Sequence, residues 1–351
     1  MNNLLQNYFK FIKRFIPKKK EGSSVGLDIG INSCKMVEIY KEGESIKILN
    51  WAIQPITGGD YSSTVKAVLN QVTMPVENIY TSIYGKGTLI RFIDMPRMSL
   101  DDLRNSFSIE ADKYFPFTQD QIYTDCYILD PQGKSKQMKI MAAAAKKELV
   151  EMRVKMITGM GFETDFIGIN PVALANAKCT MEATSADGKV VALLDMGDSV
   201  SSLTIMVGHT PQFNRDIYIG GRDLTKRISN ALAIDYDEAE KLKCNPGEKL
   251  KEIQNACEST ITNLIQELRL SLDYFSTENS NEISELIITG GAAMMTGLTE
   301  NISKQLDIKI KRWNPFEKAV LSQKISKDEL NTNSNRLGVA FGLALYQYDR
   351  N

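Results

Sequence analysis

The chain repeats one pattern of hydrophobic and polar positions at a constant offset of 167 residues. In VGLDIGINSCKMVEIY an apolar run reaches Asp28, Gly30 and small polar residues follow, and a second alternating run begins. VALLDMGDSVSSLTIMV repeats this pattern around Asp195 and Gly197. An apolar run, a glycine-containing turn and a return run predict a β-hairpin. Repetition at long spacing predicts two similar halves that face each other.

The residue types in these hairpins suit a Mg-nucleotide. A turn glycine lets backbone N–H groups approach an anion closely, and Ser or Asn side chains add donors. Asp28 and Asp195, each at the end of a predicted strand, suit a hydrated Mg²⁺ between protein and phosphate oxygens. Lys35 would add a positive charge near the phosphates. We therefore predict that the two hairpins hold a Mg-nucleotide from both sides.

A third glycine site lies closer to the C-terminus. ELIITGGAAMMTGL predicts a strand at 286–289, then Gly290-Gly291-Ala292, and then the start of a helix. Small residues at such a turn let a flat ligand such as adenine lie against the backbone; the alternative is a close strand–helix crossing without a ligand. A glycine pair also follows each hairpin, Gly58-Gly59 and Gly220-Gly221. P-loop and Rossmann fingerprints are absent.

Composition excludes several classes of function. Lys and Arg number 42 against 43 Asp and Glu, so the net charge of −1 does not indicate a nucleic-acid binder. The single histidine, His209, leaves almost no basis for His-dependent catalysis or a His-rich metal site. Five scattered cysteines favour reduced thiols in a cytosol over a disulfide framework. No apolar run approaches the ~18–20 residues that span a bilayer.

Residues 1–20 form an asymmetric arm with six basic residues and no acid. Leu5, Phe9, Ile12 and Ile16 recur at helical spacing, and Pro17 should end the helix. Aromatic side chains on one face with lysines beside them suit the surface of an anionic membrane. Packing of this arm on its own domain or on a protein partner is the alternative.

The three glycine sites, in this order, resemble the two phosphate motifs and the adenosine motif of the actin, Hsp70 and sugar-kinase superfamily. VGLDIGINSCKMVE, IEADKYFPF, DIYIGGRDLTKRI and LIQELRLSLDYF more closely resemble the type IV pilus assembly protein PilM family. The resemblance covers about residues 25–350. It implies an α/β, actin-like duplicated (ribonuclease H-like) fold of two lobes, each with a mixed five-stranded sheet, with an inserted small α+β subdomain called 1C.

The resemblance also implies a set of residues that bind ATP and Mg²⁺. Asp28 and Asp195 would hold the hydrated Mg²⁺ through water. The side chain of Asp198 departs from the family pattern and adds a negative charge that would weaken nucleotide affinity. The implied nucleotide-binding residues are Asp28, Gly30, Asn32, Ser33, Lys35, Asp195, Gly197, Ser199, Gly220, Gly221, Glu240, Lys243, Gly290, Gly291 and Ala292.

The expected domains follow from the motifs. Residues 1–24 form the arm and linker, 25–188 the first lobe with 1C inserted at about 55–165, and 189–335 the second lobe. A C-terminal helix within 336–351 packs back on the first lobe. In the resembled family the cleft between subdomains 1A and 1C binds the N-terminal peptide of the inner-membrane protein PilN. Tyr114-Phe115-Pro116-Phe117 is the candidate anchor, although such a cluster also suits a core or a rigid turn.

The expected function is therefore a cytoplasmic ATP-binding scaffold of the type IV pilus assembly platform. It would lie at the inner membrane and bind a PilN-like tail and other platform proteins. The sequence leaves open whether ATP is hydrolysed; we expect slow or no hydrolysis, because no residue suggests itself as a general base. The alternatives are an FtsA-like membrane-associated actin homologue and a small-molecule kinase or ATPase of the same superfamily.

Overall fold

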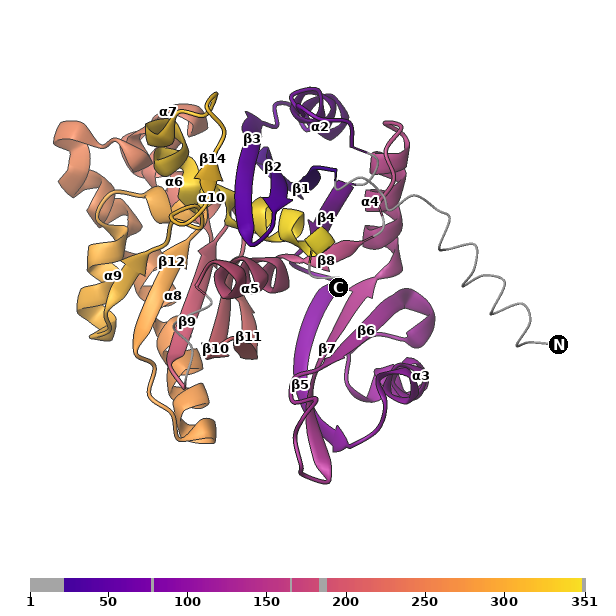
Figure 1. The fold of residues 1–351 in the computed structure, drawn as a ribbon. Coiled ribbons are helices and arrows are strands. Elements are labelled where there is room, and N and C mark those ends of the chain that lie inside the picture. Colours follow the sequence, from indigo (N-terminus) through magenta and orange to yellow (C-terminus); the bar gives the residue numbers. More distant parts are fainter. Residues whose placement is uncertain (1–21, 77–78, 165, 183–187, 349–351) are drawn as a thin grey trace.

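Two large sheets lie on either side of a central pair of helices in the computed structural model of the chain (Figure 1). The structure describes residues 22–76, 79–164, 166–182 and 188–348. The predicted arm at residues 1–20 lies outside this described part. Among the described residues, no helix is both long and apolar enough to cross a membrane.

The first sheet has six strands in the order β14-β3-β2-β1-β4-β8. Helices α2 and α4 cover one of its faces, where side chains such as Val65 and Ile157 pack on Leu27 and Met36. The bounds are β1 Ser24–Ile29, β2 Ser33–Glu42, β3 Ser45–Pro55, β4 Ile79–Ile83, β8 Ile167–Ile169, β14 Val320–Leu321, α2 Tyr61–Leu69 and α4 Lys147–Thr158.

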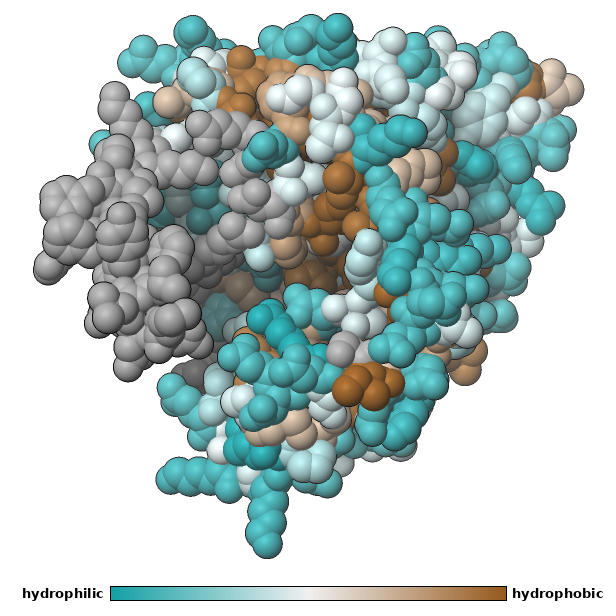
Figure 2. Space-filling view, turned by 90° about the vertical axis from the view of Figure 1, so that its right-hand side faces the viewer, coloured by the Kyte–Doolittle hydropathy of each residue, from teal (hydrophilic) through white to brown (hydrophobic). Residues whose placement is uncertain are grey.

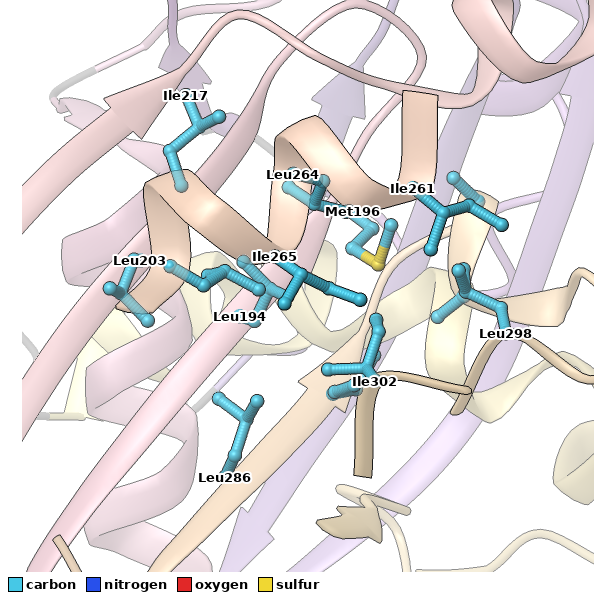
Figure 3. Packing of buried hydrophobic residues seen from close by; sticks show 14 of the residues in the cluster. Leu194, Met196, Leu203, Ile217, Ile261, Leu264, Ile265, Leu286, Leu298 and Ile302 are labelled. Atoms are coloured by element: carbon cyan, nitrogen blue, oxygen red, sulfur yellow. The ribbon is translucent and has the colours of Figure 1, made fainter. Parts of the chain in front are cut away.

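The second sheet has five strands in the order β11-β10-β9-β12-β13. Helices α6 to α9 cover its outer face, and Figure 3 shows Leu194 and Leu203 of the sheet beside Leu264 of α8 and Ile302 of α9. The bounds are β9 Val190–Met196, β10 Ser201–Val207, β11 Thr210–Ile217, β12 Glu285–Thr289, β13 Ile310–Arg312, α6 Gly221–Leu232, α7 Tyr236–Cys244, α8 Leu250–Asn279 and α9 Leu298–Leu306.

The central layer consists of α5 (Asn170–Met181) and α10 (Lys327–Leu345). Their apolar residues form one cluster with the inner faces of both sheets. A Cβ atom on Gly26 of β1 would overlap the Ala340 carbonyl oxygen, and one on Gly342 would overlap that of Ala173 in α5. Close packing of α10 against both β1 and α5 therefore requires glycine at these two positions.

A separate three-stranded sheet, in the order β5-β7-β6, projects below the first sheet (Figure 1). Helix α3 (Leu100–Glu110) packs on one face of it through Leu103 and Phe107. The Ser99 hydroxyl accepts a hydrogen bond from the Asp102 N–H and begins this helix. The strands are β5 Thr88–Pro96, β6 Ile122–Ile128 and β7 Gln137–Lys146.

This architecture confirms the predicted α/β, duplicated two-lobe fold with an added α+β unit, and it differs in two details. The first sheet has six strands rather than five, because β14 pairs in parallel with the edge strand β3. The C-terminal helix begins at Lys327 rather than Arg336, because the Ser326 hydroxyl caps its polar first turns by accepting from the Glu329 N–H. The apolar pattern of the sequence indicates only the second half of this helix.

Candidate nucleotide site between the two lobes

The two predicted hairpins have the same backbone geometry. In β1–β2 Asp28 pairs with Lys35, and in β9–β10 Asp195 pairs with Ser202, which preserves the offset seen in the sequence. Each turn closes with one hydrogen bond, from the Gly30 N–H to the Ser33 carbonyl at 3.0 Å and from the Gly197 N–H to the Val200 carbonyl at 3.0 Å. Asp28 and Asp195 thus lie at equivalent places near the ends of the central strands β1 and β9.

The two hairpins differ in charge. In the first, the Lys35 Nζ lies 3.1 Å from the Asp28 Oδ2, so the buried carboxylate has a cationic partner. In the second, Ser202 occupies the position of Lys35, and within the described residues the Asp195 carboxylate has neither an ionic partner nor a hydrogen-bond donor. Burial first, and the Asp28 carboxylate second, raise the pKa of Asp195 to about 6.

The third glycine site lies directly beside Asp195. Strand β12 runs parallel to β9 with Thr289 opposite Asp195, and Gly290 follows with φ of 92°. A Cβ on Gly290 would lie 2.6 Å from the Asp195 Oδ1, so only glycine fits this turn. A Cβ on Gly291, by contrast, would have no atom within 4 Å. The backbone at Gly291 is therefore open to a ligand.

Helices α6 and α7 supply the remaining predicted residues. The Gly221 N–H donates to the Gly197 carbonyl at 3.0 Å, which ties the start of α6 to the second turn. The buried Lys243 donates to the Glu240 Oε2 at 2.6 Å and to the Thr225 Oγ1 at 3.0 Å. Lys243 and Glu240 therefore bring a fixed ion pair to the wall formed by α6 and α7.

All of the predicted nucleotide-binding residues except Gly220 line one cavity of about 610 Å³. Gly220 lies just behind the second turn, where a Cβ would clash with the Asp198 backbone. The pair Gly58-Gly59, with φ of 62° and 74°, lies in an exposed turn before α2 and does not line the cavity. The sequence did not single out Tyr84, Asn170, Asp216 or Arg336, which also line it.

A direct contact joins the turns of the two hairpins. The Asn32 Nδ2 donates to the Asp198 Oδ1 at 2.5 Å, and the Arg222 guanidinium lies 2.8 Å from the Asp198 Oδ2. Asn32 belongs to the first lobe and Asp198 to the second, so this hydrogen bond connects the lobes across the cavity. The sequence showed only the charge of Asp198, because its partner Asn32 is 166 positions away.

The donor set fits a Mg-nucleotide. Asp28 and Asp195 provide the hard oxygen ligands that Mg²⁺ prefers, and Asp195 lacks a cation of its own. The described residues hold no cluster of three His, Cys, Asp or Glu side chains that could hold a bare metal ion. The turn N–H groups and Lys35 and Lys243 would supply the donors for the phosphates.

The predicted peptide anchor lies in the three-stranded unit. Phe115 is buried in its core, in an edge-to-face contact with Phe107 at 5.9 Å, so its side chain serves packing. The ring of Tyr114 stacks on the ring of Phe107, with 5.3 Å between their centres. Phe117 is partly buried, with Lys146 5.9 Å from its ring centre, and Pro116 is exposed. Only Tyr114, Pro116 and Phe117 thus remain candidates for peptide contact.

The fold defines the class of protein. Among the solved structures that share it is MreB5 of Spiroplasma citri bound to AMPPNP, with a TM-score of 0.51 and 12% identity over 94% of this chain and 97% of that chain. Another is EutJ of Carboxydothermus hydrogenoformans, with a TM-score of 0.50 and 15% identity over 92% of this chain and 89% of that chain. The PilM–PilN type IV pilus biogenesis complex has a TM-score of 0.83 and 23% identity over 92% of this chain and 98% of that chain. The protein has the actin-like ATPase fold.

The family model described as type IV pilus assembly protein PilM matches residues 26–348, so the chain belongs to that family. Among curated relatives it is 23% identical to the cell division protein FtsA of Neisseria meningitidis serogroup B, over 64% of this chain and 63% of that protein. It is also 23% identical to FtsA of Enterococcus hirae, over 84% of this chain and 79% of that protein.

The raised pKa of Asp195 predicts a pH-dependent effect of its removal. Since the folded-state pKa is about 6 against 3.8 for an unperturbed Asp, the ionised carboxylate destabilises the ligand-free protein above pH 6. Asp195→Asn should raise the free energy of unfolding at pH 7.5 by up to about 3 kcal/mol. The gain should shrink as the pH falls from 6 toward 3.8.

Urea unfolding in EDTA at several pH values measures this effect. Asp273→Asn, which removes an exposed carboxylate on α8, controls for the change in net charge. An Asp195→Asn protein that is less stable than the wild type at pH 7.5 would contradict the account of Asp195.

Proposed function

We propose that the protein is a nucleotide-held scaffold of the type IV pilus assembly platform, which holds Mg-ATP between its two lobes. The observation that carries the proposal is the single cavity in which two matched hairpin turns, each with an aspartate, face each other beside the open backbone at Gly291. Nucleotide-bound neighbours of the same fold, such as MreB5 with AMPPNP, support it. Asp28 and Asp195 would hold Mg²⁺ through water.

The second part of the proposal is a partner. The solved structure with TM-score 0.83 is a complex of PilM with PilN, which supports binding of the N-terminal tail of a PilN-like inner-membrane protein. Figure 2 shows a hollow with a hydrophobic floor between the main body above and the three-stranded unit below. The three-stranded unit and α4 also expose large apolar side chains, Tyr127 and Met152, that could contact a peptide.

This partner would place the protein at the cytoplasmic face of the inner membrane, beside other platform proteins. Contact of the basic arm at residues 1–20 with anionic lipid would add to that attachment. Membership of the PilM family favours this assignment over an FtsA-like cell division protein or a small-molecule kinase.

An equilibrium titration with Mg-ATP tests the nucleotide site. Asp195→Ala should weaken Mg-dependent binding at least ~10-fold, or about 1.4 kcal/mol, because it removes one of the two carboxylates for the metal. Without Mg²⁺ the two proteins should differ much less. Wild-type protein that does not bind Mg-ATP would overturn the proposal.

Asp198→Ala is the matched variant, and it should change the affinity for Mg-ATP in the opposite direction. It removes a negative charge from the phosphate region, breaks the bond to Asn32 and frees Arg222. Mg-ATP should then bind about fivefold more tightly, a change of about 1 kcal/mol. If both variants weaken binding equally, the loss reflects general damage to the cavity, and the assigned roles are wrong.

The partner site calls for a separate binding measurement with a synthetic N-terminal peptide of a PilN-like protein. Phe117→Ala should weaken binding about tenfold, since it removes an aromatic contact beside Lys146. Tyr274→Ala, which removes an exposed aromatic side chain from α8 in the other lobe, is the control. Equal affinity of both variants for the peptide would exclude Phe117 as an anchor.

A further inference from the structure

Asp195 belongs to a row of polar side chains that crosses three neighbouring strands. Ser202 of β10 pairs with Asp195 of β9 on one side and with Asp216 of β11 on the other. Directly paired residues point to the same face of a sheet, so Asp216 faces the same side as Asp195, with about 10 Å between their Cα atoms. Both carboxylates line the cavity.

Asp216 has no cation to neutralise it. Within the described residues it has no ionic partner, and the only group that acts on its pKa against burial is the neighbouring Ser202 side chain. Burial raises the pKa of Asp216, which makes this carboxylate a stronger base than an exposed one. An uncompensated carboxylate in a cavity costs stability, so its position calls for a function or a ligand.

Neighbouring side chains hold Ser202 and Asp216 in place. The Asn214 Nδ2 donates to the Ser202 Oγ at 3.3 Å and to the Thr204 Oγ1 at 3.0 Å. Asn214 thus holds the Ser202 hydroxyl beside Asp216, its partner in the neighbouring strand.

The first lobe has no counterpart of Asp216. Its equivalent row runs from Asp28 through Lys35 to Ile53 on β3. One half of the duplicated structure thus carries a carboxylate–lysine pair followed by an apolar residue, and the other carries two carboxylates joined by a serine. Because the sheet scaffold is otherwise alike, a structural need of the hairpin does not explain Asp216.

The three-stranded unit partly closes the cavity near Asp216. Strand β5 approaches β11 here, and the Lys86 Nζ lies 5.5 Å from the centre of the Tyr218 ring. Tyr84 and Asn170 line the cavity from the first lobe, and the Asn170 Oδ1 accepts from the Ser82 hydroxyl at 2.7 Å. A water in this part of the cavity would be enclosed by polar groups from both lobes.

We propose that Asp216 is the general base of a slow nucleotide hydrolysis, a catalytic residue that orients and deprotonates the attacking water. This inference rests on the proposed binding of Mg-ATP in the same cavity. The oxygen of the water forms a bond to the terminal phosphorus, and the bond from that phosphorus to the bridging oxygen breaks. The electron pair leaves with ADP, and the water proton passes to the Asp216 carboxylate and then to solvent.

The test compares phosphate release and binding in the full-length wild type, Asp216→Asn and Asp273→Asn. At saturating Mg-ATP, Asp216→Asn should reduce phosphate release about 100-fold, because it removes the proton acceptor but keeps the shape. Its affinity for Mg-ADP should stay within about twofold of the wild type, whereas its affinity for Mg-ADP with aluminium fluoride should fall at least ~10-fold. Asp273→Asn should match the wild type throughout.

The contrary results separate the role of Asp216 from the binding of nucleotide. Wild-type protein that binds Mg-ATP tightly but releases no phosphate above the buffer rate would overturn the role of Asp216 and leave the scaffold intact. Equal phosphate release by the wild type and Asp216→Asn would overturn it as well, as would an equal loss of affinity for Mg-ADP and for the aluminium fluoride complex. Wild-type protein that binds no nucleotide would overturn both proposals.

Discussion

The close packing of α10 against β1 and α5 determines the geometry of the cleft. Gly26 and Gly342 leave no room for a side chain at these contacts, and the Ser24 hydroxyl donates to the Ala344 carbonyl at 2.6 Å. At the other end of the helix, the Asn335 carbonyl accepts from the Gly290 N–H and the Thr289 hydroxyl, each at 2.8 Å. Helix α10 thus contacts both sheets, and its packing determines the distance between the two hairpin turns.

Within this frame the duplicated halves differ in their electrostatics. The first lobe pairs Asp28 with Lys35, whereas in the second Asp195 and Asp216 form no ion pair among the described residues, and Asp198 accepts from Asn32. A divalent cation that arrives with a nucleotide would supply the charge that the second lobe lacks. The Asn32–Asp198 contact would have to rearrange as phosphate enters. The symmetric backbone would therefore position a nucleotide, and the different side chains of the two lobes would determine its reaction.

The sequence predicts the hairpins well, because alternation, a turn glycine and the repeat all act locally. The two-lobe fold follows from the repeat and from the resemblance. Asp216 and the partners of Asp198 could not be predicted, since they depend on strand neighbours and on the distance between lobes. Phe115 shows a further limit: aromatic side chains suit a core and a binding surface alike, and here burial decides for the core. The first half of α10 could not be predicted from the apolar pattern either, because only the second half of this helix is apolar.

The central claim is that two equivalent turns, one from each lobe, close on a single Mg-nucleotide. Hydrogen exchange followed by mass spectrometry measures both turns in one experiment, with and without Mg-ATP. The account predicts that peptides covering residues 28–36 and 195–203 become protected together and over the same range of nucleotide concentration. Protection of only one of these turns, or of neither at concentrations where nucleotide is bound, would contradict it.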